Sequence, residues 1–389
     1  MQKLALDEEI LLQVEQPARY IGGEINSVKK DPDKVKLRFA MCFPDVYEIG
    51  MSHLGIQILY SMFNRREDVY CERVFSPWTD LDRILREKKI PLFTLESQRP
   101  VRECDFLGIT LQYEMCYTNI LQVLELSEIP LRAADRSDND PIVIGGGPCT
   151  YNPEPIAPFF DLFYMGEGEV IYDQLLDLYL AHKEAGGDRS SFLKKAAALP
   201  GIYVPSLYEP RYREDGTLSS FEPLCPEAPA SVRRLVMSVL DRADFIDTPL
   251  VPFIRVTQDR SVLELMRGCI RGCRFCQAGN VYRPQREHSV EYLKRYAEKL
   301  LKITGNEEIS LSSLSSSDYS RLQEFLEYLI QYTKERKINI SLPSLRIDAF
   351  SLDVMQRIQD VKKSSLTFAP EAGTQRLRDV INKGITEED

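Results

Sequence analysis

Three closely spaced cysteines constrain this chain more than any other feature of its sequence. Cys269, Cys273 and Cys276 follow a C-x3-C-x2-C spacing within Glu-Leu-Met-Arg-Gly-Cys-Ile-Arg-Gly-Cys-Arg-Phe-Cys, residues 264–276. Thiolate is a soft ligand, and three thiolates in one short loop suit an iron–sulfur cluster or a zinc ion. No further cysteine follows Cys276. Because a fully ligated cluster usually has four cysteines, the spacing predicts one iron without a protein ligand, where a substrate or cofactor could bind.

Two other interpretations of these cysteines remain open on the sequence. A distant fourth ligand would complete a zinc site, or the three residues would be unrelated buried thiols. The nine cysteines of the chain include these three and are otherwise scattered, which is not the pattern of a secreted disulfide framework. A reducing, cytoplasmic compartment is therefore expected.

Length and composition set wide limits on function. A chain of 389 residues suggests about two to three domains, and its apolar and charged fractions are ordinary for a globular protein. The formal net charge of -10 gives no global signature of nucleic-acid binding, although a local basic groove stays compatible with it. The N-terminus has no signal-peptide pattern, and no apolar run approaches the ~18 residues of a membrane span. We expect a cytoplasmic protein with no membrane association.

The first half of the chain alternates short apolar segments with amphipathic ones. After a helical lead-in over residues 1–35, the pattern predicts strands at 35–43, 69–75, 106–113, 141–146 and 161–165, and helices at 53–63, 81–87, 116–126 and 169–180. This alternation implies βαβ units and a parallel, doubly wound, Rossmann-like sheet over residues 36–185. Ligands of such sheets bind at the carboxyl ends of the strands.

The second half repeats the alternation after a change of composition. Residues 186–258 are rich in proline and predict a structured connector, with a hairpin turn at Asp215-Gly216. Residues 259–389 then predict strands at 261–266, 308–314, 339–342 and 365–369, and helices at 289–301, 319–334, 352–359 and 373–382. The cysteines follow the first of these strands. In a β/α barrel, the loops at the carboxyl ends of the strands build the active site.

The cysteine loop, with the aromatic Phe275 just before its last cysteine, resembles the cluster loop of radical S-adenosylmethionine (radical SAM) enzymes. The resemblance implies a 4Fe–4S cluster on Cys269, Cys273 and Cys276, whose open iron chelates the amino and carboxylate groups of SAM. One electron then splits the sulfonium and leaves a 5′-deoxyadenosyl radical, which abstracts hydrogen from a substrate. The protein's part is to position the reactants and to exclude water.

The first half resembles the cobalamin-binding-type domain of one branch of radical SAM proteins, and most closely a subfamily of uncharacterised, B12-binding-domain members. The matching segments are Pro-Asp-Val-Tyr-Glu-Ile-Gly-Met-Ser-His-Leu-Gly at 44–55, residues 145–148 and 152–155, and Gly-Glu-Gly-Glu at 166–169. The resemblance implies cobalamin held near His53, Gly145, Gly146 and Gly147. Domains that place a histidine below the cobalt carry Asp-x-His-x-x-Gly, and Met51 and Ile56 break that pattern. The alternatives are a retained scaffold whose glycines serve turns and packing, and a helix-capping or core role for His53.

The resemblance also implies residues near SAM. The serine-rich segment 312–319 takes the place of a Gly-Gly-Glu segment, with hydroxyls instead of the acid. The residues expected at SAM are Phe275 at the adenine, Ser313 and Ser315 at the methionine end, Arg346 at a carboxylate or substrate anion, and Glu371 at a ribose hydroxyl. The alternatives are a surface position for Arg346 and a helix N-terminus stabilised by Glu371.

The predicted fold class is therefore α/β, with an N-terminal doubly wound, Rossmann-like domain of the cobalamin-binding type and a partial radical SAM β/α barrel. Barrels of this family usually have six βα units, and the pattern here shows about four. The sequence thus predicts a chain that is truncated at its C-terminus.

The expected function is reductive cleavage of SAM, followed by cobalamin-dependent methyl transfer or another radical modification of an unknown substrate. No catalytic residue is assigned. The expected partner is an electron donor such as flavodoxin or ferredoxin, and RNA or a ribosomal component as the substrate has no support from the net charge. Two other classes compete: a non-catalytic iron–sulfur redox sensor or electron-transfer protein, and a cobalamin-responsive binding module with a degenerate barrel. SAM cleavage would separate the enzyme from both.

Overall fold

The computed structural model describes residues 5–242, 246–346 and 368–389. The chain divides into two compact units. Unit 1 comprises Met1–Met237 and Asp244–Thr257, and unit 2 comprises Ser238–Ala243 and Gln258–Asp389. Within the described ranges, no helix is both long enough and apolar enough to cross a membrane.

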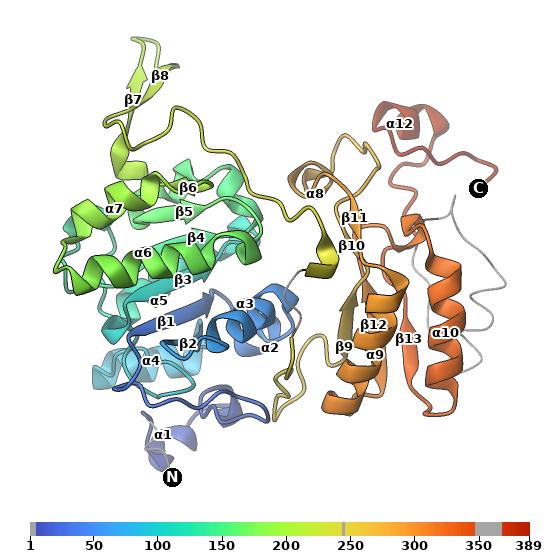
Figure 1. Ribbon diagram of the computed structural model, residues 1–389, viewed down its shortest axis with the longest axis horizontal. Coiled ribbons are helices and arrows are strands. Elements are labelled where there is room, and N and C mark those ends of the chain that lie inside the picture. The colour runs from blue at the N-terminus through green and yellow to red at the C-terminus, as the bar shows by residue number, and fades with distance from the viewer. Residues whose placement is uncertain (1–4, 243–245, 347–367) are drawn as a thin grey trace. The chain divides into compact units, whose positions relative to one another are not determined.

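A six-stranded sheet forms the centre of unit 1, in the order β2-β1-β3-β4-β5-β6 (Figure 1). The strands are β1 (Leu37–Phe43), β2 (Val69–Phe75), β3 (Phe106–Thr110), β4 (Ile142–Gly146), β5 (Leu162–Tyr164) and β6 (Ile202–Tyr203). The first five are parallel and β6 is antiparallel to β5, so the predicted parallel sheet is confirmed. The order 2-1-3-4-5 is that of flavodoxin-like sheets and differs from the classic Rossmann order. It places the switch point, where ligands of such sheets bind, between β1 and β3.

Helices cover both faces of this sheet (Figure 1). The helices α3 (Leu54–Asn64), α6 (Tyr172–Glu184) and α7 (Arg189–Ala197) pack on one face, and α4 (Thr79–Lys88) and α5 (Tyr117–Leu126) pack on the other. Every residue of β1 is buried, with Phe39 and Met41 in the first core and Ala40 and Cys42 in the second. Strands buried on both faces read as mostly apolar runs, as in β3 and β4, which contain no charged residue.

Smaller elements complete unit 1. They are α1 (Glu8–Leu11), α2 (Tyr47–Gly50) and the antiparallel hairpin of β7 (Tyr208–Tyr212) and β8 (Leu218–Pro223), which projects from the unit in Figure 1. Gly216 has a φ of 81° in the hairpin turn, a left-handed conformation that glycine adopts readily. The predicted turn at Asp215-Gly216 is therefore confirmed.

Edge strand β2 carries a buried charge cluster. The Arg73 guanidinium is 1% exposed and contacts Glu24 at 2.7 Å and Glu96 at 2.6 Å. Burial raises the pKa of Glu96 to about 7, against the opposing effect of Arg73. The cluster ties two loop segments to the edge of the sheet.

Unit 2 contains a three-stranded parallel sheet in the order β13-β12-β9. Its strands are β9 (Ser261–Glu264), β12 (Glu308–Ser312) and β13 (Asn339–Ser341), and its longer helices are α9 (Val290–Thr304) and α10 (Leu322–Lys334). The Ser289 hydroxyl caps α9 by accepting a hydrogen bond from Tyr292 N at 3.2 Å, and Gly305, with a φ of 69°, ends the helix. Three of the predicted βα strands are thus confirmed.

Two predictions in unit 2 have other outcomes. The predicted strand 261–266 is wrong beyond Glu264, because Met266–Arg267 (β10) leaves the parallel sheet and pairs antiparallel with Arg286–Glu287 (β11). The predicted helix 352–359 and most of the predicted strand 365–369 lie outside the described residues. The remaining helices are α8 (Gln277–Val281) and α12 (Gln375–Val380).

Candidate functional site

The cysteine loop starts from a backbone position that requires glycine. Gly268 has a φ of 84° and follows β10 directly. A Cβ at this position would lie 2.5 Å from the carbonyl oxygens of both Tyr282 and Pro284. The close approach fixes the start of the loop against the segment that leads into β11, one residue ahead of Cys269.

Backbone N–H groups point at two of the three thiols. Cys269 Sγ accepts a hydrogen bond from Arg271 N at 3.4 Å. Cys276 Sγ caps α8 and accepts from Gly279 N at 3.3 Å. These hydrogen bonds orient the two sulfurs, and thiol sulfur is a soft ligand of the kind that iron–sulfur clusters use. The donor set therefore fits an iron–sulfur cluster.

The sulfurs are half-buried and are not arranged around a common centre. All three cysteines are free. Across the ranges that the structure describes, no group of three histidine, cysteine or acidic side chains has a geometry that could hold a metal ion. The assignment of the three thiols as ligands therefore rests on their chemistry and their shared loop.

Asp318 braces the middle of the loop from the neighbouring strand. This residue ends a 3-10 helix, Ser316–Asp318, that follows β12, and its carboxylate contacts the Arg271 guanidinium at 2.6 and 2.9 Å. Ser315 Oγ donates to the same carboxylate at 2.7 Å. Burial works against ionisation of Asp318, but the hydrogen bonds from Arg271 and Ser315 outweigh it and hold its pKa below the ordinary value. The prediction that hydroxyls replace the missing acid overlooked Asp318, which lies within the same segment, 312–319.

The C-terminal helix segment contacts the other side of the loop. Asn382 Nδ2 donates to Gly272 O at 2.8 Å, and Arg274 N donates to Ile381 O at 2.9 Å. The Lys383 ammonium lies 5.9 Å from the centre of the Phe275 ring. Contacts within the protein therefore hold the loop on both sides.

The residues predicted to contact SAM fall into two groups. Ser313 Oγ lies 2.9 Å from Ser316 Oγ, and Ser315 is buried against Asp318, so both serines stay at the carboxyl end of β12. Lys383 links the second group, because its carbonyl accepts from Arg346 at 2.9 Å and its ammonium lies 3.1 Å from Glu371. Arg346 is 8% exposed, so its predicted surface alternative is wrong.

Phe275 and Glu371 differ from these buried groups in exposure. The Phe275 side chain is 54% exposed, which leaves its ring accessible. Glu371 is exposed and has a φ of 67°. The helix that follows it, α12, is capped by Thr374, whose hydroxyl accepts from Leu377 N at 3.3 Å. Glu371 therefore does not cap that helix.

A second set of polar residues at the end of β9 was not predicted. Glu264 pairs with Arg267 at 3.0 Å, and His288 Nε2 lies 3.9 Å from the same carboxylate. His288 Nδ1 lies 3.1 Å from Asp241, and its ring stacks on Tyr292 at 4.2 Å. Burial opposes ionisation of Glu264, but Arg267 and His288 outweigh it and lower its pKa. The signal in the sequence was an acid three residues before an arginine at the end of a strand.

His53, predicted to lie near cobalamin, acts as a helix cap. Its Nδ1 accepts a hydrogen bond from Ile56 N at 3.3 Å at the start of α3, and its ring packs on Phe43 at 5.3 Å. Burial lowers its pKa to about 4, although a hydrogen bond with Gln112 acts in the opposite direction. The ring is neutral at physiological pH, and one of its nitrogens is engaged by the backbone.

The predicted cobalamin glycines accommodate protein atoms. A Cβ on Gly145 would lie 2.6 Å from the Phe163 ring, and one on Gly147 would lie 2.8 Å from Leu111 O. A Cβ on Gly146 would lie 3.4 Å from the Tyr172 hydroxyl. Gly145 and Gly147 therefore allow close packing, whereas Gly146 has only an ordinary contact with Tyr172.

One atom at the switch point does lack a partner. Thr110 Oγ1, at the carboxyl end of β3, is buried and has no hydrogen-bond partner in the described part of the chain. An unsatisfied buried hydroxyl is costly unless a ligand or water pairs with it. This is the one feature of the edge that favours a bound molecule.

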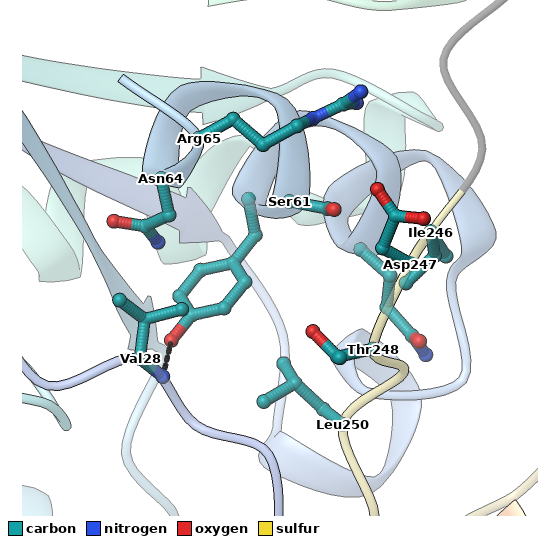
Figure 2. A pocket seen from close by; sticks show the side chains of 10 residues that line it. Val28, Ser61, Asn64, Arg65, Ile246, Asp247, Thr248 and Leu250 are labelled. Carbon is teal, nitrogen blue, oxygen red and sulfur yellow. Dashed lines mark hydrogen bonds between the residues drawn. The ribbon is translucent and has the colours of Figure 1, made fainter. Parts of the chain in front are cut away.

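A pocket of about 130 Å³ lies elsewhere in unit 1, between α3 and residues 246–250 (Figure 2). The Ser61 and Thr248 hydroxyls point toward the space, and the Tyr60 hydroxyl accepts from Val28 N at 2.8 Å (Figure 2). Cofactor pockets usually exceed about 300 Å³. The pocket is too small for SAM or cobalamin and contains none of the residues predicted to bind them.

Comparisons with known proteins agree with the architecture of the cysteine loop. The family described as "Radical SAM superfamily" matches residues 263–389, and "Radical SAM proteins, N-terminal" matches residues 55–205. These matches support a radical SAM protein.

Two curated relatives cover much of the chain. Uncharacterized protein MJ0966 of Methanocaldococcus jannaschii is 28% identical over 360 residues, which cover 90% of this chain and 64% of the relative. Uncharacterized methyltransferase PH0819 of Pyrococcus horikoshii is 26% identical over 274 residues, which cover 65% of this chain and 50% of the relative. The chain thus spans about half to two thirds of the length of these relatives.

A solved structure shares the fold. The radical S-adenosylmethionine methyltransferase TsrM from Kitasatospora setae, with tryptophan substrate and a SAM analogue bound, superposes with a TM-score of 0.53 at 12% identity. The superposition covers 90% of this chain and 62% of TsrM. At this identity the likeness concerns the α/β fold.

Proposed function

We propose that the protein is a radical SAM enzyme that holds a 4Fe–4S cluster on Cys269, Cys273 and Cys276 and cleaves SAM reductively. The observation that carries the proposal is the C-x3-C-x2-C loop at the end of β10, within the residues that the radical SAM family matches. When bound, such a cluster supplies the electron that breaks the carbon–sulfur bond of SAM.

The residues of the chain have distinct parts in this proposal. Backbone N–H groups donate to Cys269 and Cys276 and orient their sulfurs for ligation. Ser313 offers a hydroxyl at the carboxyl end of β12 for the polar end of SAM, and the accessible Phe275 ring offers a face for its adenine. Ser315, predicted at the same end of SAM, is buried and donates its hydroxyl to Asp318. Arg346 supplies positive charge for a carboxylate.

Methyl transfer is the reaction class that we propose. The support is that one curated relative is described as a methyltransferase and that TsrM, which shares the fold, is a radical SAM methyltransferase. The substrate class is open, and the electron would come from a one-electron donor such as flavodoxin or ferredoxin.

We also propose that cobalamin binds at the carboxyl ends of β1 and β3, where the strand order of the sheet reverses. The sheet order and the unsatisfied Thr110 hydroxyl support it. His53 Nδ1 is engaged by Ile56 N, and Gly145 and Gly147 are closely packed against protein atoms, so these residues give the proposal no support. No step of the proposed reaction therefore depends on cobalamin.

The experiment is anaerobic reconstitution with iron and sulfide, followed by dithionite reduction in the presence of SAM. We expect 5′-deoxyadenosine from the wild type and none from Cys273→Ala. Cys225→Ala is the matched control, since Cys225 is a partly exposed cysteine of unit 1, and it should retain product formation. A cluster without deoxyadenosine would favour the redox-sensor alternative.

A further inference from the structure

The cysteine loop carries a positively charged side chain, that of Arg271, at its centre. Arg271 lies between Cys269 and Cys273, and its backbone N–H donates to Cys269 Sγ at 3.4 Å. Its carbonyl accepts a hydrogen bond from the Arg283 guanidinium at 3.0 Å. The backbone of Arg271 is thus held both by a thiol that we assign as a ligand and by the segment before β11.

The carboxylate of Asp318, in the 3-10 helix after β12, orients the Arg271 side chain. Arg271 Nε lies 2.9 Å from Asp318 Oδ2, and its terminal nitrogen lies 2.6 Å from Oδ1. This is the two-pronged geometry that binds a guanidinium most specifically. The Asp318 side chain is 6% exposed and that of Arg271 is 31% exposed, so water screens the pair only in part.

Neighbouring groups fix the Asp318 carboxylate in turn. Ser315 Oγ donates to its Oδ2 at 2.7 Å, and the Gln285 side chain donates to its main-chain carbonyl at 3.4 Å. The acid is therefore anchored in the 3-10 helix after β12, independently of the cysteines. The contact between Asp318 and Arg271 therefore does not depend on a cluster being bound to the cysteines.

We propose that Arg271 and Asp318 form a positioning pair that sets the reduction potential of the centre bound by the three cysteines. This inference rests on the proposed function. Reduction adds negative charge to the cluster, so the arginine charge favours the reduced form and the aspartate charge opposes it. Net charge near the cluster is one of the factors that set such potentials. The ion pair keeps the two effects nearly balanced.

The two partners therefore have opposite predicted effects. Asp318→Asn leaves the arginine charge uncompensated and should raise the midpoint potential. Arg271→Gln leaves the aspartate charge uncompensated and should lower it. One unit charge near the cluster, at an effective dielectric constant of about 20, should change the ratio of reduced to oxidised cluster roughly tenfold, or about 59 mV. The double variant should return close to the wild-type value.

The test is a redox titration of reconstituted wild type and variants, followed by electron paramagnetic resonance, with iron and sulfide contents measured in parallel. Arg321→Gln is the matched control, because Arg321 pairs with Glu324 in the same unit at an exposed site, and no shift is expected. Arg271→Lys keeps the charge and should stay near the wild-type potential even where Arg271→Gln loads poorly. Shifts of opposite sign in the single variants support the inference.

Other results of the titration would refute the role of the Arg271–Asp318 pair, and they also distinguish its failure from failure of the proposed function. Potentials that shift in the same direction, or not at all, with cluster present in every variant, refute the inference alone. Loss of cluster in both Asp318→Asn and Arg271→Lys assigns the pair a purely structural role and also refutes it. If the wild type binds no more iron and sulfide than Cys273→Ala, the proposed function fails, and the inference fails with it.

Discussion

Replacing His53 with asparagine should remove a specific loss of stability in acid. In the folded protein, burial lowers the pKa of His53 from 6.5 to about 4. Above the unfolded value the ring is neutral in both states. As the pH falls, the unfolded chain takes up a proton that the folded chain resists, so the stabilisation is lost between 6.5 and about 4.

The size of the effect follows from the two pKa values. At about pH 5, protonation of His53 in the unfolded chain lowers the free energy of unfolding by about 2 kcal/mol, because each pH unit below the unfolded pKa contributes about 1.4 kcal/mol. Asparagine is a good helix N-cap and does not titrate. His53→Asn should therefore match the wild type at about pH 8 and exceed its stability by about 2 kcal/mol at about pH 5.

The chain offers a convenient probe for this measurement. Trp78 is the only tryptophan of the sequence and lies in unit 1, as His53 does. Urea unfolding followed by its fluorescence reports that unit, and comparing variant with wild type at each pH cancels the titration of all other groups. A stability difference that stays constant from about pH 8 to about pH 5 would refute the assignment of His53 as a buried neutral cap.

Two further predictions concern the loop and the charged edge of the sheet. Gly268→Ala should sharply reduce iron and sulfide loading, because the added Cβ would lie 2.5 Å from two carbonyl oxygens. Gly305→Ala is the control, because Gly305 has a similar positive φ and its Cβ would meet no atom within 4 Å. Equal loading of the two variants would contradict the argument. Arg73→Met should cost about 3–5 kcal/mol in urea unfolding, because it leaves two buried carboxylates without their partner. Arg99→Met, at an exposed pair, should cost less than about 1 kcal/mol, and a similar cost for both would show that the buried cluster is not specially stabilising.

The parallel sheet of unit 1 could be predicted because its strands are buried on both faces. In β1, consecutive residues such as Phe39 and Ala40 belong to opposite cores, so the run from Phe39 to Phe43 is apolar throughout and only Arg38, which pairs with Glu72, interrupts the strand. The order of the strands could not be predicted in this way, since apolar runs carry no information about which neighbours pair. The antiparallel addition of the two-residue strand β6 was equally hidden, because it depends on contact with β5.

The cysteines of the site could be predicted from the sequence, but the residues that hold their loop in place could not. Spacing alone identified Cys269, Cys273 and Cys276 as a group. Asp318 lies 42 residues after Cys276 along the sequence, and only the fold brings it to Arg271. The end of the parallel strand β9 at Glu264 was missed for the same reason, since the pairing of β10 with β11 is a tertiary contact that local sequence does not specify.

The assignment of His53 shows the limit of motif matching. Its place after the first strand resembles that of a cobalt-ligating histidine, yet the same position begins α3, where a side-chain acceptor is needed. The two roles require the same residue type at the same place. Only the hydrogen bond to Ile56 N distinguishes them.

The central claim is that three cysteines hold a cluster with one iron open to SAM. Electron paramagnetic resonance of the anaerobically reduced, reconstituted protein tests it directly when spectra are recorded with and without SAM. We predict a 4Fe–4S signal that changes when SAM is added and that is absent in Cys273→Ala. A cluster signal that SAM leaves unchanged would contradict an open iron, and a wild type that binds zinc and no iron–sulfur cluster would contradict the account as a whole.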